Sequence, residues 1–473
     1  MSFSLPRIIQ GGMGAGVSNW RLARAVSRLG QLGVVSGTGL DQILVRRLQD
    51  GDPGGETRRA LSQFPFPRMV QRLLETYFVP EGRRADEPYS YGGIHTVESR
   101  RQTQETCILA NFVEVFLARL GHDNPVGINY LEKIQLPHLP SLYGALLAGV
   151  GVVIMGAGIP LEIPGVLDAL VQHRPASYPV AVTGAPGGAV VRTRFDPADF
   201  IEPGAPPPEL TRPLFWPIVS TDRLAAIIRR RANGPVDGFV VEGPRAGGHN
   251  APPRRAGLDD RGQPVYGPAD ACDLEGMRRL GLPFFLAGAQ GSPEALQAAL
   301  AEGAAGVQVG TAFALCAESG LAPDLRRRIV RAALSGEASV FTDPLASPTG
   351  FPFKVARLPG SLSEAGVYAG RRRRCDLGFL REVYQRPDGR VGYRCPAEPA
   401  STFVAKGGRG EDTGERRCLC NALLANIGMA QRSAAGDEPP LVTLGDDLAG
   451  LGRFRPAEGT EFTAADVLRV LLA

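Results

Sequence analysis

Short apolar runs recur along residues 6–310, and most are followed by a stretch with helical periodicity. There are eight such runs, and most carry glycine at or just beyond their ends, as in RIIQGG near Ile9 and VGVVIMG near Val153. Continuous apolar runs are typical of parallel strands buried on both faces, and their alternation with helices indicates a βα repeat. Eight repeats predict an α/β fold, the (β/α)8 or TIM barrel. The other six runs lie near Val35, Ile128, Ile218, Val240, Phe285 and Val309.

The helices expected between these runs begin with capping residues. Asn19 precedes WRLARAVSRLG, Thr221 precedes DRLAAIIRRRA, and Ser292 precedes PEALQAALAEG, which has proline at its first position. Side-chain oxygens of these residue types accept hydrogen bonds from the unpaired N–H groups of a helix start. We therefore expect ordinary connecting helices after the first, fifth and seventh strands.

Three segments depart from the repeat. Residues 41–121 contain helical patterns and follow the second strand, on the side where such barrels build their sites, which predicts a lid or a wall of the pocket. Residues 178–195, YPVAVTGAPGGAVVRTRF, have two alternating stretches around a Pro-Gly-Gly turn and predict an inserted hairpin. Beyond Gly360 the chain becomes charged, glycine-rich and cysteine-rich. We expect residues 1–360 to form the barrel and 361–473 to form an appended module.

Composition and charge narrow the function classes. The 473 residues are 44% hydrophobic and 21% charged, as in ordinary globular proteins. The 52 basic and 48 acidic residues nearly cancel, which leaves no electrostatic footprint for nucleic acid. The arginine runs at 229–231 and 371–374 are typical of a solvated surface or of carboxylate partners, and only occasionally of a phosphate-binding patch.

The chain shows no sign of a targeting or membrane segment. MSFSLPRIIQ has no basic stretch leading into an apolar one, so we expect a cytoplasmic protein. Residues 143–161 approach membrane-spanning length, but their glycines predict a helix end followed by a buried strand. We therefore expect no membrane partner.

Two turns near the end of the predicted barrel point to a ligand. LAGAQGSPEAL follows the seventh strand and VQVGTAF follows the eighth, where such barrels often bind phosphate through backbone N–H groups and a helix N-terminus. Either turn alone would be explained as a strand end, but both in this order predict a phosphate-bearing cofactor. The candidate phosphate contacts are Gly288, Gln290, Gly291, Gly310 and Thr311.

The first strand ends in QGGMGAG, residues 10–16. This glycine spacing does not give G-x-G-x-x-G with a matching acidic residue, so the signal for a dinucleotide-binding fold is weak. On a barrel, the same glycines would let the backbone lie against a flat cofactor ring. Met13 would pack on that ring or fill core, and core is the commoner use of methionine.

Four stretches together resemble the nitronate monooxygenase family, formerly called 2-nitropropane dioxygenases. They are IIQGGMGAGVSNWRLARAV, VEGPRAGGHNAPPR, LAGAQGSPEALQAALAEGAAGVQVGTAFALCAES and SPTGFPFK, which lie between Pro6 and Lys354. The same family includes FMN-dependent enoyl reductases of fatty acid and polyketide synthesis. The resemblance implies a (β/α)8 barrel that holds FMN without a covalent bond and oxidises a small-molecule substrate, an alkyl nitronate or nitroalkane, with O2.

The resemblance also implies roles for single residues. Gly12, Met13 and Gly14 would lie against the isoalloxazine ring with Asn129 near it, and the five turn residues above would take the phosphate. His249 matches the histidine of the family's AGGH motif, assigned in members that act on nitroalkanes as the base that removes the proton next to the nitro group. Neutral imidazole near pH 7 suits that task, and in an enoyl reductase it could polarise or protonate the substrate carbonyl. Gly247 and Gly248 precede it in the motif.

The remaining titratable residues of the barrel portion give no comparable signal. Glu242 lies at the end of the sixth strand and could orient a neighbour or solvate the rim, so no role is assigned to it. The other histidines are expected to be surface or loop residues. They are His95, His122, His138 and His173.

Four of the seven cysteines crowd into the last quarter of the chain. In a cytoplasmic protein disulfides are disfavoured, and four thiolates would match tetrahedral zinc. Their spacing is irregular and contains no C-x-x-C pair, so free buried thiols are the alternative and no metal ligand is assigned. The four are Cys375, Cys395, Cys418 and Cys420.

Three functions stay open at this point. The first is an FMN-dependent oxidoreductase of the nitronate monooxygenase type, and the second is an enoyl-thioester reductase that uses FMN and NAD(P)H. The third is an inactive barrel that serves as a binding component through its cysteine-rich tail. That tail has no counterpart in compact nitronate monooxygenases, and it could define a different pocket, bind a partner or close a homo-oligomer.

Overall fold

Eight parallel strands close into a barrel, as the apolar runs predict. The computed structural model describes residues 4–185, 190–434, 436–456 and 461–473. The strands follow one another around the barrel in chain order, and β1 pairs with both β2 and β11, which closes the ring. They are β1 (Ile8–Gln10), β2 (Leu32–Ser36), β3 (Val126–Leu131), β4 (Val152–Gly156), β8 (Leu214–Val219), β9 (Phe239–Glu242), β10 (Phe284–Ala287) and β11 (Gly306–Val309).

Helices surround the barrel, and the predicted caps are in place. Asn19, Thr221 and Ser292 each accept a hydrogen bond from a backbone N–H of the first helical turn, so the helices begin where the sequence indicates. The outer helices are α1 (Trp20–Arg28), α6 (His138–Leu147), α7 (Ile163–Val171), α8 (Asp222–Arg231), α9 (Leu274–Arg279), α10 (Pro293–Ala301), α11 (Thr311–Ala314) and α12 (Pro323–Leu334).

Apolar side chains fill the interior of the barrel. Trp216 and Phe285 are fully buried there, with ring centroids 4.9 Å apart, beside aliphatic residues of β1, β2, β4 and β9. Residues 143–161 form the end of α6 followed by the buried strand β4, as expected. Within the described ranges, no helix is both long enough and apolar enough to cross a membrane.

Both predicted insertions form secondary structure of their own. Residues 41–121 contain four helices, and the hairpin of residues 178–195 is confirmed by the antiparallel pairing of β5 with β7, although its Pro-Gly-Gly turn lies outside the described residues. The helices are α2 (Leu40–Gln49), α3 (Glu56–Leu61), α4 (Pro67–Tyr77) and α5 (Arg101–Arg119). The hairpin elements are β5 (Ala176–Val180), β6 (Val182–Thr183), β7 (Val191–Phe195) and the 3-10 turn η2 (Pro197–Asp199).

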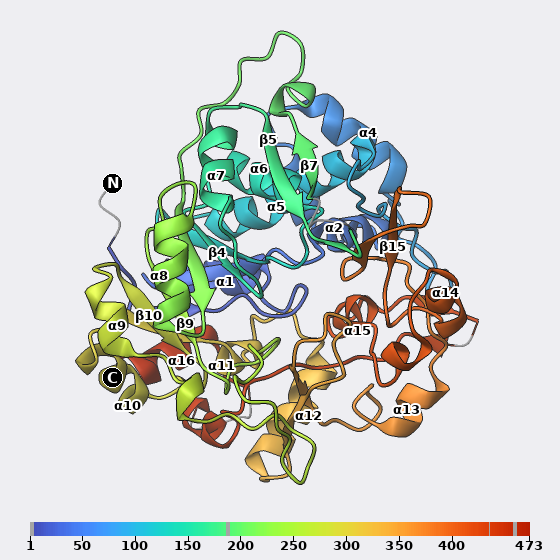
Figure 1. Cartoon of the computed structure of the whole chain (residues 1–473). Helices are drawn as coiled ribbons and strands as arrows, with labels where there is room; N and C mark the ends of the chain where they lie inside the picture. Colours follow the sequence, from blue (N-terminus) through green and yellow to red (C-terminus); the bar gives the residue numbers. More distant parts are fainter. Residues whose placement is uncertain (1–3, 186–189, 435, 457–460) are drawn as a thin grey trace.

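The chain beyond β11 runs across the mouth of the barrel and returns to its outer wall. In Figure 1 the orange and red segments with α13, α14 and α15 lie beside the barrel, whereas α16 and the C-terminus lie next to α10. Strand β14 pairs with β6 of the hairpin insertion, so insertion and extension share one small sheet. The boundary at residue 360 stays a prediction.

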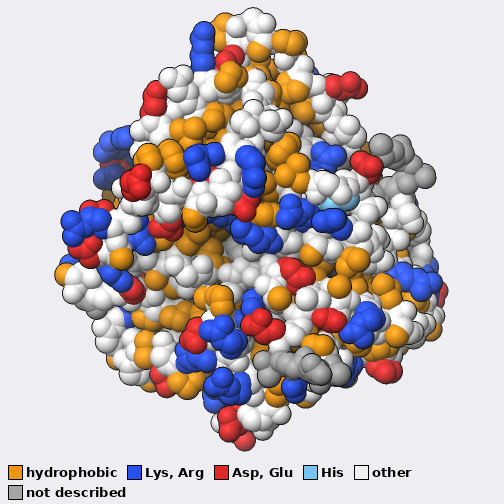
Figure 2. All heavy atoms as spheres, turned by 180° about the vertical axis from the view of Figure 1, so that it is seen from behind, with side chains coloured by type: hydrophobic (Ala, Val, Ile, Leu, Met, Phe, Trp, Pro, Cys, Tyr) orange, Lys and Arg blue, Asp and Glu red, His pale blue; other side chains and the backbone are white. Residues whose placement is uncertain are grey.

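The remaining elements lie in this last part of the chain and in the loop after β9. They are η3 (Pro268–Asp270), β12 (Val340–Asp343), β13 (Phe353–Ala356), α13 (Ala365–Gly370), β14 (Glu382–Gln385), β15 (Val391–Arg394), α14 (Ala400–Ala405), η4 (Gly410–Thr413), α15 (Leu419–Ala425), β16 (Arg432–Ser433), β17 (Gly436–Asp437), η5 (Ala449–Phe454) and α16 (Ala464–Leu471). Figure 2 shows basic and acidic side chains interspersed on the rear face of the molecule.

Candidate functional site

A cavity opens at the carboxyl ends of the barrel strands, where such barrels carry their sites. The fold brings every candidate site residue to its wall, although these residues come from five different strand ends. They are Gly12, Met13, Gly14, Asn129, Gly247, Gly248, His249, Gly288, Gln290, Gly291, Gly310 and Thr311. The roles assigned to them stay predictions.

The loop after β1 is drawn tightly against β3. A Cβ on Gly12 would lie 2.4 Å from the Cβ of Asn129, so only glycine fits there. The hydroxyl of Ser18 accepts a hydrogen bond from the N–H of Met13 at 2.9 Å and donates to the carbonyl of Gly11 at 2.8 Å, which fixes the loop. The amide oxygen of Asn129 is buried and has no partner among the described residues. An orphan acceptor beside a cavity fits a ligand that brings an N–H donor, as a flavin ring does.

The AGGH loop after β9 is held by residues far along the chain. The carbonyl of Gly248 accepts from the N–H of Lys354 at 2.9 Å, and the N–H of Gly248 donates to the hydroxyl of Thr443 at 2.8 Å. A Cβ on Gly247 would lie 2.9 Å from the backbone nitrogen of Gly445. The two glycines are therefore explained in part by the close passage of residues 443–445.

His249 is anchored through one ring nitrogen. Its Nε2 lies 2.7 Å from the hydroxyl of Ser347, which is itself 2.8 Å from the hydroxyl of Thr349. The rings of His249 and Phe353 pack in an edge-to-face arrangement, with their centroids 4.8 Å apart. No hydrogen bond to Nδ1 is found in the described ranges, so this nitrogen stays free for a ligand.

The environment of His249 makes it a weaker base than its sequence context suggests. Burial, helped by the positive charge of Lys133, lowers the pKa of His249 to about 4. The imidazole is therefore unprotonated at neutral pH, as expected, but its pKa lies below the range near pH 7 that suits a general base best. The physical reason is that desolvation disfavours the imidazolium.

The two turns predicted to bind phosphate are partly occupied by the extension. Gly288 has a φ of +99°, and a Cβ there would lie 3.1 Å from the backbone nitrogen of Ala246, so the turn requires glycine. The N–H of Gly291 donates to a carboxylate oxygen of Asp447 at 3.2 Å, and the hydroxyl of Thr311 accepts from the N–H of Gly445 at 2.9 Å. A phosphate would reach Gly291 only if Asp447 turned away, because the two anions repel each other.

The C-terminal extension supplies an apolar wall to the cavity. Sequence reasoning missed these residues, and the only signal for them is the apolar run in CLCNALLANIG. The insertion of residues 41–121, expected to form a lid or wall, contributes no lining residue, although Thr38 and Gly39 just before it do. The apolar residues that the extension contributes are Phe379, Leu380, Leu419, Cys420, Leu423, Leu424 and Leu444.

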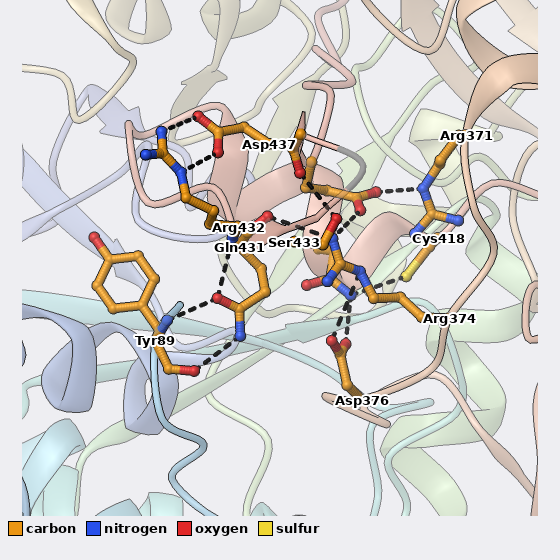
Figure 3. Close-up of polar contacts among 12 residues, drawn as sticks. Tyr89, Arg371, Arg374, Asp376, Cys418, Gln431, Arg432, Ser433 and Asp437 are labelled. Carbon is orange, nitrogen blue, oxygen red and sulfur yellow. Dashed lines mark hydrogen bonds and ion pairs between the residues drawn. The ribbon is translucent and has the colours of Figure 1, made fainter. Parts of the chain in front are cut away.

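Buried ion pairs and amide contacts fix the extension in place (Figure 3). Glu438 is buried and accepts hydrogen bonds from Arg371 and, at 3.2 Å, from Arg374. Gln431 exchanges two hydrogen bonds of 2.9 Å with the backbone of Tyr89, which belongs to the insertion. Arg371 and Arg374 of the arginine run at 371–374 therefore pair with carboxylates. Carboxylate pairing is one of the roles that the sequence leaves open for this run.

The four cysteines of the extension lie together in its core. Cys395 and Cys418 are buried, and Cys375 and Cys420 pack against them. A hydrogen bond with Cys395 lowers the pKa of the Cys375 thiol, whereas burial raises the pKa of Cys418 to about 11. In the part of the chain that the structure describes, no group of three or more His, Cys, Asp or Glu side chains is placed to hold a metal ion. The zinc hypothesis therefore gains no support.

Two of the other four histidines, His95 and His138, are less exposed than expected. His122 lies in a loop and His173 in a turn, and both are partly exposed. His138 begins α6 and is buried, and burial lowers its pKa to about 4, so its expected surface or loop position is wrong. His95 does lie in a loop, but it is buried with its Nε2 2.9 Å from a carboxylate oxygen of Asp41. Local pattern could not reveal either burial, because each depends on packing with distant segments.

A comparison with protein families finds a match in the barrel portion of the sequence. A family model described as nitronate monooxygenase matches residues 214–343, which contain β8 to β12 and His249. No curated protein matches the chain. The solved structure of FabK from Thermotoga maritima is 16% identical, with 99% of this chain and 91% of that chain covered and a TM-score of 0.48.

Two further structures give similar values. Nitroalkane oxidase from Streptomyces ansochromogenes is 16% identical, with 99% of this chain and 95% of that chain covered and a TM-score of 0.47. The enoyl reductase domain of MlnA, from the macrolactin biosynthesis cluster of Bacillus amyloliquefaciens, is 10% identical, with coverages of 99% and 94% and a TM-score of 0.46. Likenesses this weak decide nothing about function. The family match over residues 214–343 agrees with the resemblance to nitronate monooxygenases for that part of the chain.

Proposed function

We propose that this chain is an FMN-dependent oxidoreductase that oxidises alkyl nitronates with O2. The observation that carries the proposal is His249, an unprotonated imidazole on the wall of a glycine-lined cavity at the carboxyl ends of the strands. The family match supports the reaction class, because it covers His249 and both predicted phosphate turns.

The residues present fit FMN at this site. When bound, FMN supplies the electron acceptor and the reaction with O2. The backbone at Gly12, Met13 and Gly14 would carry the flat ring, with the orphan amide oxygen of Asn129 accepting from it. The phosphate would be held by Gly288, Gln290, Gly310 and Thr311, and by Gly291 once Asp447 turns away.

His249 decides which form of substrate is favoured. With Nε2–H donating to Ser347, the lone pair of Nδ1 is free to accept a proton from a carbon acid. A pKa of about 4 makes this a weak base, so we expect nitronates, which are already deprotonated, to be preferred over neutral nitroalkanes. Lys133, whose charge acts on His249, also favours an anionic substrate.

The test compares the two substrate forms in wild type and in His249→Asn. Asparagine keeps a polar side chain but cannot serve as the base, so turnover of a neutral nitroalkane should fall by about 100-fold or more. Oxidation of the preformed nitronate should stay within about tenfold of wild type, because it needs no proton transfer to this residue. O2 consumption with each substrate is the measurement. Equal effects on both would contradict the assigned role.

The apolar wall from the extension favours a second candidate, an enoyl-thioester reductase that uses NAD(P)H. Such a wall suits an acyl chain, and His249 could then polarise the thioester carbonyl. Anaerobic addition of NADPH separates the two candidates, since rapid bleaching of the flavin would favour the reductase. The expected cytoplasmic location and homo-oligomer stay predictions in either case.

A further inference from the structure

Two cavities meet at the end of β9. The first is the cofactor cavity described above, and the second lies on the other side of the AGGH loop, lined by Ile159, Tyr266 and Phe351 among others. Four residues line both cavities, and two of the four are apolar. Glu242 and His249 are therefore the two polar side chains that line both cavities.

The carboxyl group of Glu242 has no partner. Within the described ranges, it makes no hydrogen bond or ion pair, and the surface that it leaves accessible faces the two cavities. Burial alone raises the pKa of Glu242 to about 8, so at neutral pH it carries a proton and can donate a hydrogen bond. The other titratable groups on the two cavity walls are His249, Arg245, Cys420 and Asp447 in the first and Arg254, Tyr266 and Asp270 in the second.

A purely structural acid would be paired, as the buried acids in the described ranges are. Glu114 accepts hydrogen bonds from Arg47 at 2.6 Å and from the N–H of Trp20 at 2.8 Å. Glu438 is paired with two arginines. An unpaired carboxyl group that is largely removed from water lowers the stability of the folded protein. A ligand that supplies the missing hydrogen-bond partner offsets this loss.

We propose that Glu242 is a further substrate-contacting residue, whose carboxyl group donates a hydrogen bond to an oxygen of the substrate bound beside His249. In a nitronate this oxygen belongs to the nitronate group, and in a thioester it is the carbonyl. No proton is transferred in this contact, so the acid lowers the energy of negative charge on the oxygen. The inference rests on the proposed function for the identity of the oxygen.

The experiment measures binding of butyrate to the FMN-loaded protein between pH 6 and pH 10. Butyrate carries a planar oxyanion like a nitronate but does not react, and its binding is followed by the change in flavin absorbance. In wild type we expect the affinity to fall about tenfold or more as pH rises through about 8, because the donor becomes a repelling anion. Glu242→Gln, which keeps a donor without an ionisable group, should show no such step. Glu242→Leu should bind butyrate about fivefold more weakly at pH 6.

A second measurement guards against misfolded variants. Because the folded pKa of Glu242 is raised, folding takes up a proton, and wild-type stability should fall as pH rises from about 4.5 to about 8. Glu242→Gln should lack this part of the decline in thermal midpoint. The proposal is overturned if wild type shows no binding step, if Glu242→Gln keeps it, or if Glu242→Leu binds like wild type at pH 6. If the wild-type protein shows the pH-dependent step in butyrate binding but does not oxidise nitronates, the proposed function is refuted and the role of Glu242 in binding an oxyanion is not.

Discussion

The cavity has two walls that are built in different ways. The barrel wall consists of strand ends and glycine turns, and it presents backbone, with positive φ and close approaches at Gly14 and Gly288. The extension wall consists of apolar side chains such as Phe379 and Leu423, which come from a loop and a short helix. Backbone groups suit features shared by many ligands, such as a phosphate or a flat ring, whereas side chains determine which other molecule fits beside them.

The two walls also differ in what holds them. Parallel strand pairing fixes the strands of the barrel wall, and hydrogen bonds with residues 443–447 hold its turns. Buried ion pairs and amide contacts help to fix the extension wall. A change that loosens the apolar extension wall but leaves residues 443–447 in place should therefore spare cofactor binding and weaken substrate binding. Three variants test this division.

The largest effect is expected for Glu438→Gln. The substitution leaves Arg371 and Arg374 buried with less compensating charge, and breaking a buried pair of this kind costs about 3–5 kcal/mol. Urea unfolding followed by fluorescence measures this loss. The matched control is Glu302→Gln, which removes an exposed ion pair with Arg278 and should cost less than about 1 kcal/mol. Equal unfolding midpoints for the two variants would contradict a supporting role for the Glu438 network.

A smaller effect is expected for Gly288→Ala on the barrel wall. The left-handed φ strains any other residue by about 1–2 kcal/mol, and the new methyl group would press on the backbone of Ala246. We expect FMN to bind about tenfold more weakly, measured by quenching of its fluorescence. Gly281→Ala introduces similar backbone strain where no atom lies within 4 Å of the new Cβ, so it should leave FMN affinity unchanged. Unaltered FMN binding by Gly288→Ala would remove this turn from the cofactor site.

The barrel could be predicted from sequence because its signals are local. Apolar runs, capping residues and glycine turns each report on their own strand or helix, and parallel pairing then brings their ends together. For the extension wall, the apolar run in CLCNALLANIG indicates a buried segment but not that this segment faces the cavity. Asp447 has the pattern of a surface acid in GDDLAG, and only the folded chain brings it to the N–H of Gly291. The low pKa of His249 and the raised pKa of Glu242 were equally hidden, since desolvation depends on what packs around a group.

The smallest effect is expected for Phe379→Ala, and it bears most directly on what the extension wall does. Each buried CH2 of a ligand contributes about 0.8 kcal/mol, so in wild type the KM for alkyl nitronates should fall with each added carbon until the apolar wall is covered. Removing the Phe379 ring takes away part of that wall, and we expect about a fivefold rise in KM for the longest chain with little change for the shortest. FMN affinity should be unaltered, because the ring belongs to the extension wall. The measurement is a chain-length series of initial rates. If KM changes equally at every length, the wall acts through the overall shape of the site and does not contact the alkyl chain; if FMN binding also weakens, the two walls are not independent.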